Sequence, residues 1–187
     1  MMKKTLFCLI ALLCTAGGIQ AQKGIPSGMR MEITTSERDN AQYSLFTYRD
    51  DDSTFGYYLG LGRTSGEFAI GSGKTSFTIA DVRETCLWLG ATADDAFAML
   101  DTILSLYGTE AGTTMEFASR ATGGAERLAD RTVTTCVVEK KLLGGKRLLF
   151  TFASGKRQRA VHLDKSVVKE LRFGLKTDLK LHPKQHR

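Results

Sequence analysis

The sequence predicts an α+β fold in which about eight or nine short antiparallel strands are covered by two helices. Segments that alternate polar and apolar residues, rich in β-branched and aromatic types, follow one another between glycine, serine and aspartate turns. Two other segments, residues 93–107 and 165–180, repeat apolar residues at helical spacing. The two prolines, Pro26 and Pro183, lie near the chain ends, so no proline interrupts the strands and helices between them.

The first helix is the element that the sequence defines best. Thr92 is a favourable N-cap residue, and Asp95 is placed to complete an acidic form of the capping box. Gly108 predicts a left-handed stop at the C-terminal end. One face of this helix is apolar, and it holds Ala93, Phe97, Leu100, Ile103, Leu104 and Tyr107.

The N-terminal residues predict export. Lys3 and Lys4 precede a short apolar run at residues 5–15, and small and polar residues then lead to Ala21. A positive start, an apolar stretch and a small residue before the cut are typical of a cleaved signal peptide. The run is shorter than the ~20 residues that a membrane-spanning helix needs. We therefore expect cleavage of residues 1–21 and a mature periplasmic or extracellular chain.

The cysteines divide between the signal peptide and the mature chain. Cys8 and Cys14 follow large apolar residues rather than the small residue that a lipid-attachment cysteine requires, which disfavours a lipoprotein. Cys86 and Cys136 remain after cleavage, and an oxidising compartment would allow one disulfide between them. The alternative is two buried thiols that act as small apolar side chains.

Charge is distributed unevenly along the chain. Residues 22–100 carry 7 basic and 11 acidic side chains, whereas residues 101–187 carry 17 basic and 9 acidic ones. A basic half can favour an anionic surface, such as lipid headgroups or an acidic glycan, or another envelope protein. Export disfavours nucleic acid as the partner. The alternative is a solvated basic face that only keeps the protein in solution.

The first half predicts a meander of strands. Residues 30–36 and 42–48 alternate as strands do, and Asp50–Ser53 supplies the next turn. The three adjacent aspartates lack the spaced ligands and the glycine of a calcium loop, which favours a solvated turn. The strand at 55–63 places glycines on one face, which leaves room for close approach by a helix or an aromatic ring.

Turn residues predict two further short strands in this half. A turn at 64–66 leads into a strand at 67–71, and a second turn leads into a strand at 75–80. The stretch that follows is ambiguous, because Asp81 could cap a short helical turn or residues 85–89 could form a strand.

The second half repeats this organisation. Its best hairpin has Gly144–Gly145 at the turn, and Asp164 is placed to cap the second helix. Segments 68–74 and 150–156 share the pattern Phe-x-Ile/Phe-x-Ser-Gly-Lys. The similarity indicates either a duplicated strands-then-helix unit, over residues 29–108 and 113–181, or a coincidence of turn chemistry. Strands of this half are predicted at residues 113–120, 131–141, 146–153 and 159–163.

Motifs for nucleotide binding or nucleophilic catalysis are incomplete. Gly71–Thr75 resembles the end of a phosphate-binding loop, but Phe68 stands where that motif needs its first glycine. No Gly-x-Ser-x-Gly elbow is present for a nucleophilic serine. Cys136 lies in the middle of a predicted strand, which is a poor position for a reactive thiol.

The remaining titratable residues do not converge on a site. His182 and His186 have metal-ligand spacing but lie in a frayed tail, and His162 is expected to be exposed on a strand. Asp94 and Asp95 favour the N-terminus of the first helix rather than acid–base catalysis. We therefore predict no catalytic residue, no metal ligand and no cofactor.

One basic stripe is a positive functional signal. Beside its apolar face the second predicted helix carries Lys165, Lys169, Arg172, Lys176 and Lys180. A basic amphipathic helix can lie on an anionic membrane surface. Residues 171–181 also alternate with a period of two, so the alternative for this part is a strand, which would remove the stripe.

We expect one globular domain at residues 29–181, between a flexible leader at 22–28 and a disordered tail at 182–187. The leading functional hypothesis is an exported, non-catalytic binding or envelope-associated module. The first alternative is a carrier of an apolar or lipid-like ligand, held between the strand at 55–63 and a helix. The second is a hydrolase that uses carboxylates far apart in the sequence.

Overall fold

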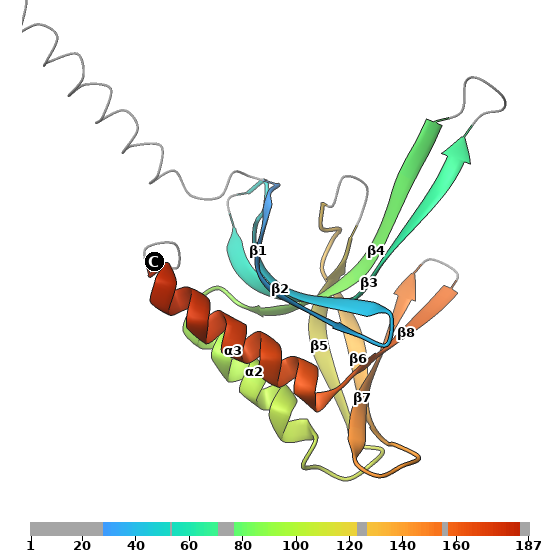
Figure 1. Cartoon of the computed structure of the whole chain (residues 1–187), viewed down its shortest axis with the longest axis vertical. Helices are drawn as coiled ribbons and strands as arrows, with labels where there is room; N and C mark the ends of the chain where they lie inside the picture. The colour runs from blue at the N-terminus through green and yellow to red at the C-terminus, as the bar shows by residue number, and fades with distance from the viewer. Residues whose placement is uncertain (1–27, 53, 71–76, 123–126, 155–156, 184–187) are drawn as a thin grey trace, which may run out of the picture.

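The protein has the predicted α+β fold, with one antiparallel sheet and two helices (Figure 1). The computed structural model describes residues 28–52, 54–70, 77–122, 127–154 and 157–183. Within this part of the chain the sheet has 8 strands, and each strand pairs with the next one in sequence. The elements are β1 (Arg30–Arg38), β2 (Ala41–Arg49), β3 (Phe55–Ile70), β4 (Phe77–Gly90), α2 (Ala93–Leu106), β5 (Thr114–Ala121), β6 (Thr132–Lys140), β7 (Lys146–Ser154), β8 (Arg157–Leu163) and α3 (Lys165–Leu181).

The two halves of the chain have the same order of elements. Strands β1 to β4 precede α2, and strands β5 to β8 precede α3. The matching segments 68–74 and 150–156 both fall at the connection from the third to the fourth strand of their half. The turns themselves, at residues 71–76 and 155–156, lie outside the described residues. The order of elements agrees with a strands-then-helix unit that occurs twice.

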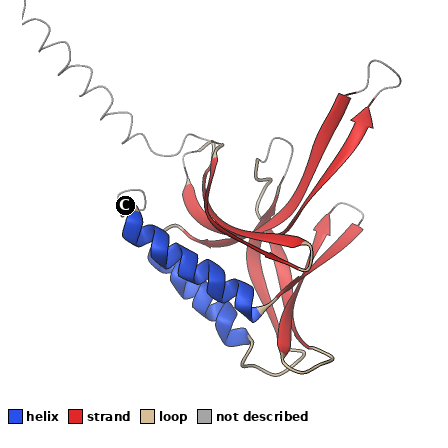
Figure 2. Cartoon of the chain, viewed as in Figure 1, coloured by secondary structure: helices blue, strands red, loops and turns tan. Residues whose placement is uncertain are grey.

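Both helices lie side by side on one face of the sheet (Figure 2). They run antiparallel, because Lys165 at the start of α3 lies 6.0 Å from the ring centre of Tyr107, just after α2. Further along, Arg172 of α3 pairs with Asp101 of α2 at 2.7 Å. The helix continues to Leu181, so the strand considered for residues 171–181 is wrong.

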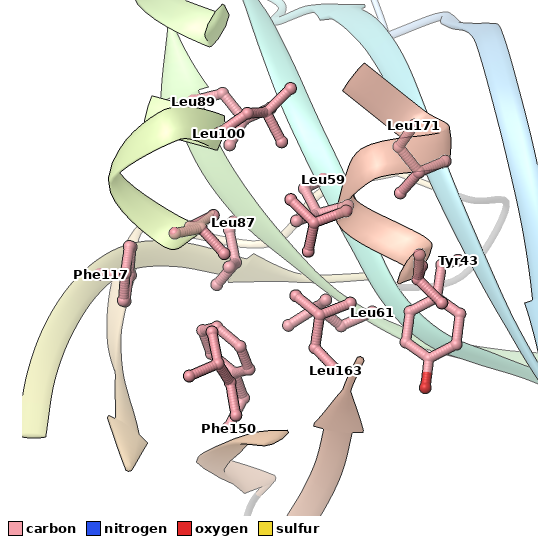
Figure 3. Close-up of a cluster of buried hydrophobic side chains, with 14 of the residues drawn as sticks. Tyr43, Leu59, Leu61, Leu87, Leu89, Leu100, Phe117, Phe150, Leu163 and Leu171 are labelled. Atoms are coloured by element: carbon pink, nitrogen blue, oxygen red, sulfur yellow. The ribbon is translucent and has the colours of Figure 1, made fainter. Parts of the chain in front are cut away.

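Apolar side chains fill the space between the helices and the sheet (Figure 3). Leu59 and Leu61 of β3, Leu87 of β4, Leu100 of α2 and Leu171 of α3 all have no exposed area. Alternate residues of each strand point to this layer, and the apolar stripes of both helices cover it. This layer is the main core of the protein.

The sheet is curved so strongly that β8 approaches β2 and β3, although they are not neighbours in the sheet order. The Tyr43 hydroxyl of β2 donates a hydrogen bond to the carbonyl of His162 in β8, at 2.5 Å. On β3, Gly62 has a φ of 61° and lies within a register shift between Leu61 and Thr64. A bulge of this kind bends a strand and increases its twist. The bend lets Val161 of β8 pack directly over Gly62.

Gly56 and Gly60 of β3 face away from the helices. A Cβ atom at Gly56 would overlap the ring of Trp88, and one at Gly60 would overlap the carboxylate of Glu84. The expected close approach of an aromatic ring is therefore confirmed for Trp88. The placement of these glycines against a helix is wrong, because the alternation of β3 turns Tyr57, Leu59 and Leu61 toward the main core under α2 and α3.

Arg30 and Arg120 each form an ion pair on this second face of the sheet. Arg30 of β1 reaches across the sheet to Glu84 of β4, and their side chains are 6% and 0% exposed. Ser44 of β2 donates to the same carboxylate, with its oxygen 3.0 Å from Oε1 of Glu84. Arg120 of β5 pairs with Asp50 in the β2–β3 turn. The predicted turn is present, but Asp50 is half-buried and paired rather than only solvated.

Two local predictions fail in the long strands of the first half. β3 runs without interruption from Phe55 to Ile70, so the turn predicted at 64–66 is wrong. β4 runs from Phe77 to Gly90 and includes the strand expected at 85–89, which excludes the helical turn at Asp81. The bulge at Gly62 bends β3 without ending its pairing with β4.

Helix α2 begins as predicted and ends differently. The side-chain oxygen of Thr92 accepts from the backbone N–H of Asp95 at 3.1 Å, and the Asp95 carboxylate accepts from the Thr92 N–H at 3.0 Å. The helix ends at Leu106, and the N–H of Gly108 donates to the carbonyl of Ser105. Gly108 does not have a positive φ, so the left-handed stop is wrong.

Candidate functional site

The outer side of α3 carries exposed lysines around an exposed aromatic ring. The opposite side of the helix is held in the core by its valines and leucines, so this side faces solvent. Phe173 lies there with 71% of its surface exposed. Lys169, Lys176 and Lys180 are exposed as well, and they lie one turn before, one turn after and two turns after Phe173. We call the surface formed by Lys169, Phe173, Lys176 and Lys180 the Lys–Phe face.

The predicted basic stripe is therefore only partly a free surface. The three lysines of the Lys–Phe face form no ion pair with another described residue. Arg172 instead turns toward α2, where its Nε and Nη2 lie 2.7 and 2.9 Å from the Asp101 carboxylate. The hydrogen bond with Asp101 raises the pKa of Arg172. Lys165 stays exposed at the start of the helix, beside Tyr107.

The acidic residues of α3 do not lie on the Lys–Phe face. Glu170 accepts a hydrogen bond from the Ser36 hydroxyl of β1 at 2.7 Å. Asp178 lies 2.9 Å from Nδ1 of His182 and points toward the sheet side of the helix. The exposed charge on the Lys–Phe face is therefore of one sign.

A second surface feature is an open cleft of about 660 Å³ beside β8, which we call the β8 cleft. It lies between the β1–β2 turn, the β6–β7 turn and β8 itself, and Figure 1 shows the β1–β2 turn beside β8. Its floor includes Tyr43, Gly62 and Val161, the residues where β8 approaches β2 and β3. The curvature of the sheet therefore forms this cleft.

More basic than acidic side chains line the β8 cleft, namely Arg38, Lys141, Arg147 and Arg159 against Asp39 and Asp164. Some of these charges are already paired. Lys141 Nζ lies 2.6 Å from the carboxylate of Asp164. Arg147 pairs at 3.0 Å with Glu139, which is not part of the lining. Asp164 is at the N-cap of α3 as predicted, but its side chain binds Lys141 and makes no capping hydrogen bond.

Two leucines form an exposed apolar edge of this cleft. Leu142 and Leu143 lie in the β6–β7 turn and are 102% and 99% exposed. The turn closes through Gly144 and Gly145, whose φ values are 91° and 82°, as the predicted hairpin requires. Two adjacent leucines without any covering side chain are unusual at a turn, where polar residues are the rule.

Cys86 and Cys136 are free thiols. Cys136 lies in the main core, whereas Cys86 lies in the second cluster on the opposite face of the sheet. Of the two alternatives, a disulfide or a pair of buried thiols, the structure has the pair of buried thiols. Burial raises the pKa of the Cys136 thiol to about 12 and also raises that of Cys86, so neither is poised as a nucleophile.

The other titratable candidates remain apart from one another. His162 lines the β8 cleft, with its Nε2 3.4 Å from Glu139. His182 contacts Asp178, and His186 lies outside the described residues. Hydrogen bonds from Thr92 lower the pKa of Asp95, which serves the helix start. Among the described residues no group of three or more His, Cys, Asp and Glu side chains could hold a metal ion.

Sequence reasoning missed the β8 cleft. Its lining comes from segments 38–43, 62–64, 141–147 and 159–164, and only the curvature of the sheet brings them together. One signal was present, because Leu142 and Leu143 stand at a predicted Gly-Gly turn where an apolar pair has no partner in the hairpin.

Comparisons with other proteins found no match. No family model, curated protein or solved structure matches the chain. Among the described helices, none is both long and apolar enough to cross a membrane.

Proposed function

We propose that the protein is an exported, non-catalytic binding module that attaches to an anionic surface of the cell envelope through the Lys–Phe face. The surface is a membrane that contains acidic phospholipid headgroups. The export part rests on the N-terminal sequence, since residues 1–27 lie outside the described part of the structure. Attachment to an anionic surface is supported by Phe173, whose side chain is 71% exposed among lysines on one face of α3.

An exposed phenyl ring between lysines fits the interface of a bilayer. The ring can enter the boundary between headgroups and acyl chains, while the flexible lysine stems keep their ammonium groups at the phosphates. Burial of a phenyl side chain contributes about 2 kcal/mol. In solution the same ring is in contact with water, and it contributes nothing to the core below α3.

The three lysines of the Lys–Phe face add an electrostatic contribution. Each lysine near an anionic membrane surface contributes about 1 kcal/mol. No acidic side chain of α3 lies among them to cancel this attraction. Because salt screens the charges over ~8 Å at physiological ionic strength, the attachment should be reversible and should weaken with salt.

Vesicle sedimentation of the mature chain, residues 22–187, tests the proposal. Vesicles of phosphatidylcholine alone are compared with vesicles that also contain phosphatidylglycerol, at low and at physiological salt. We expect sedimentation with the phosphatidylglycerol vesicles only, and several-fold weaker binding at the higher salt. Binding that is absent, or equal for both kinds of vesicle, would contradict the proposal.

Paired variants identify the surface. Phe173→Ser should weaken the partition into anionic vesicles by about tenfold. Its control is Val133→Ser, because Val133 on β6 is also an exposed apolar residue, at 56%. Lys176→Glu should weaken binding more than Lys140→Glu, which makes the same charge change away from α3. If both members of each pair bind equally, the Lys–Phe face is not the contact.

No particular observation favours the other two functions. A carrier would hold its ligand between the strand at 55–63 and a helix, but Leu59, Leu61 and Leu100 fill that space. A carboxylate-dependent hydrolase needs two carboxyl groups that face one substrate position. Glu84, the most buried carboxylate, is occupied by Arg30 and Ser44.

A further inference from the structure

We propose that the β8 cleft binds an amphiphilic anion, a small molecule with one phosphate or carboxylate head and an alkyl chain. The head would lie among the basic side chains of the cleft, and the chain would lie against the Leu142–Leu143 edge. This inference uses none of the residues of the Lys–Phe face, so it does not rest on the function proposed above.

The size and the construction of the cleft fit a small ligand. Its volume of about 660 Å³ lies within the ~300–1,000 Å³ of typical small-molecule sites. Four separate segments of the chain line it, and two of them are held together by the Tyr43 hydrogen bond to the carbonyl of His162. This bond fixes the Tyr43 side chain, which is buried at the floor of the cleft.

The charge of the lining determines the head group. Arg38, at the end of β1, is exposed and makes no hydrogen bond or ion pair with a described residue, which leaves its guanidinium available for an anion. Arg159 on β8 donates to the carbonyl of Gly62, which holds its side chain along the cleft. Asp164 is occupied by Lys141. The basic excess therefore favours an anionic head.

The apolar edge determines the rest of the ligand. Leu142 and Leu143 line the cleft and are almost completely exposed to water. Ala160 and Val161 continue this apolar surface along β8. An alkyl chain placed along it would remove the leucines from water, and this is the main gain that the cleft offers. An inorganic ion cannot make that contact, whereas an amphiphile makes both.

The test is an NMR titration of the mature chain with three probes. Hexyl phosphate is compared with inorganic phosphate and with hexyltrimethylammonium, which has the same chain and the opposite charge. We expect hexyl phosphate to shift the amide signals of residues 38–43, 141–147 and 159–164 in a saturable way. Inorganic phosphate should bind at least about tenfold more weakly. Equal binding of the cation, or shifts confined to other residues, would overturn the inference.

Matched variants distinguish the contribution of the ligand's head group to binding from that of its alkyl chain. Leu143→Ser should weaken hexyl phosphate binding by about tenfold, whereas Leu181→Ser, at another exposed leucine, should not change it. Arg38→Gln should weaken it by about fivefold, whereas Lys140→Gln should not. All four side chains are exposed, so the spectra should show an intact fold. Wild-type affinity in both Leu143→Ser and Arg38→Gln would overturn the inference.

Two further measurements relate this cleft to the membrane proposal. Lys176→Glu should retain hexyl phosphate binding even though it weakens vesicle binding, so failure of one proposal does not imply failure of the other. Once hexyl phosphate binding is established, Arg38→Gln is tested on phosphatidylglycerol vesicles. A loss that Lys140→Gln does not share identifies the ligand as a lipid headgroup, and no loss identifies it as a soluble amphiphile.

Discussion

Glu84 shows how one residue depends on several others that are distant in sequence. Its side chain has no exposed surface, and it is bound by Arg30 of β1 and Ser44 of β2. The carboxylate lies directly over Gly60, where any Cβ atom would overlap it. The hydrogen bond and the charge of Glu84 help to raise the pKa of Arg30, although burial acts in the opposite direction. One carboxylate therefore joins strands β1, β2 and β4 over a glycine of β3.

Glu84→Gln should destabilise the fold by about 3 kcal/mol, because it leaves the buried guanidinium of Arg30 without its main counter-charge. Urea unfolding of the protein measures this change. Glu116→Gln makes the same chemical change at an exposed position of β5 and should stay within about 0.5 kcal/mol of the wild type. Equal stability of the two variants would show that the ion pair does not stabilise the fold.

Single residues of the candidate sites differ in how far the sequence reveals them. The lysines of the Lys–Phe face follow from helical spacing alone, because a helix fixes which residues share a side. The pairing of Arg172 with Asp101 cannot be predicted from helical spacing, because it requires α2 to lie beside α3. The sequence does not reveal Arg38 as a site residue. Arg38 is part of a cleft only because it lies near β8, which is more than a hundred residues away in the chain.

At the scale of elements, the helices were predictable because their signals are local. The capping box of α2 joins Thr92 to Asp95, three residues apart, and needs no tertiary contact. The sequence predicted shorter strands in place of β3 and β4. Turn-forming residues inside a strand can mark a bulge as well as a turn. Pairing with β4 on both sides of the bulge at Gly62 keeps β3 a single strand, and such pairing cannot be seen in a single segment.

Thr92→Ala should cost about 1 kcal/mol, because the variant loses the hydroxyl oxygen that accepts from the Asp95 N–H. Thr102→Ala provides a control within the same helix. The Thr102 hydroxyl only bonds back to the carbonyl of Ala98, so its removal should be neutral or slightly stabilising. Thermal unfolding followed by circular dichroism compares the two. A larger loss for Thr102→Ala would contradict the assigned helix start.

For the whole molecule, the docking of α3 on β1 joins the last element to the first. Gly174 allows this contact, because a Cβ atom there would lie 2.5 Å from Cγ2 of Thr34. Nearby, the Ser36 hydroxyl donates to Glu170 of the helix. A glycine inside a helix is unfavourable by itself by about 1 kcal/mol relative to alanine. Its presence in α3 is explained by the close approach of the strand.

Gly174→Ala should therefore destabilise the protein by about 2 kcal/mol or more, although alanine is the better helix former. In a Thr34→Gly background the obstructing side chain is gone, and the same change should become neutral or stabilising. A double-mutant cycle by urea unfolding measures this coupling. An equal effect of Gly174→Ala in both backgrounds would show that the contact with Thr34 is not the cause.

The sequence by itself determined the α+β class, the span of α2, the start of α3, and the order of strands and helices in each half. It also determined which lysines share one side of α3 when residues 165–181 are helical. Each of these depends on residues within a few positions of one another, through alternation, helical spacing or capping. The tertiary structure alone decided which face of β3 meets the helices, that Arg172 leaves the stripe, and that Glu84 is buried. It also decided that Arg38, Leu143 and Val161 line one cleft, because only the bend at Gly62 and the curvature of the sheet bring β8 to β2 and β3.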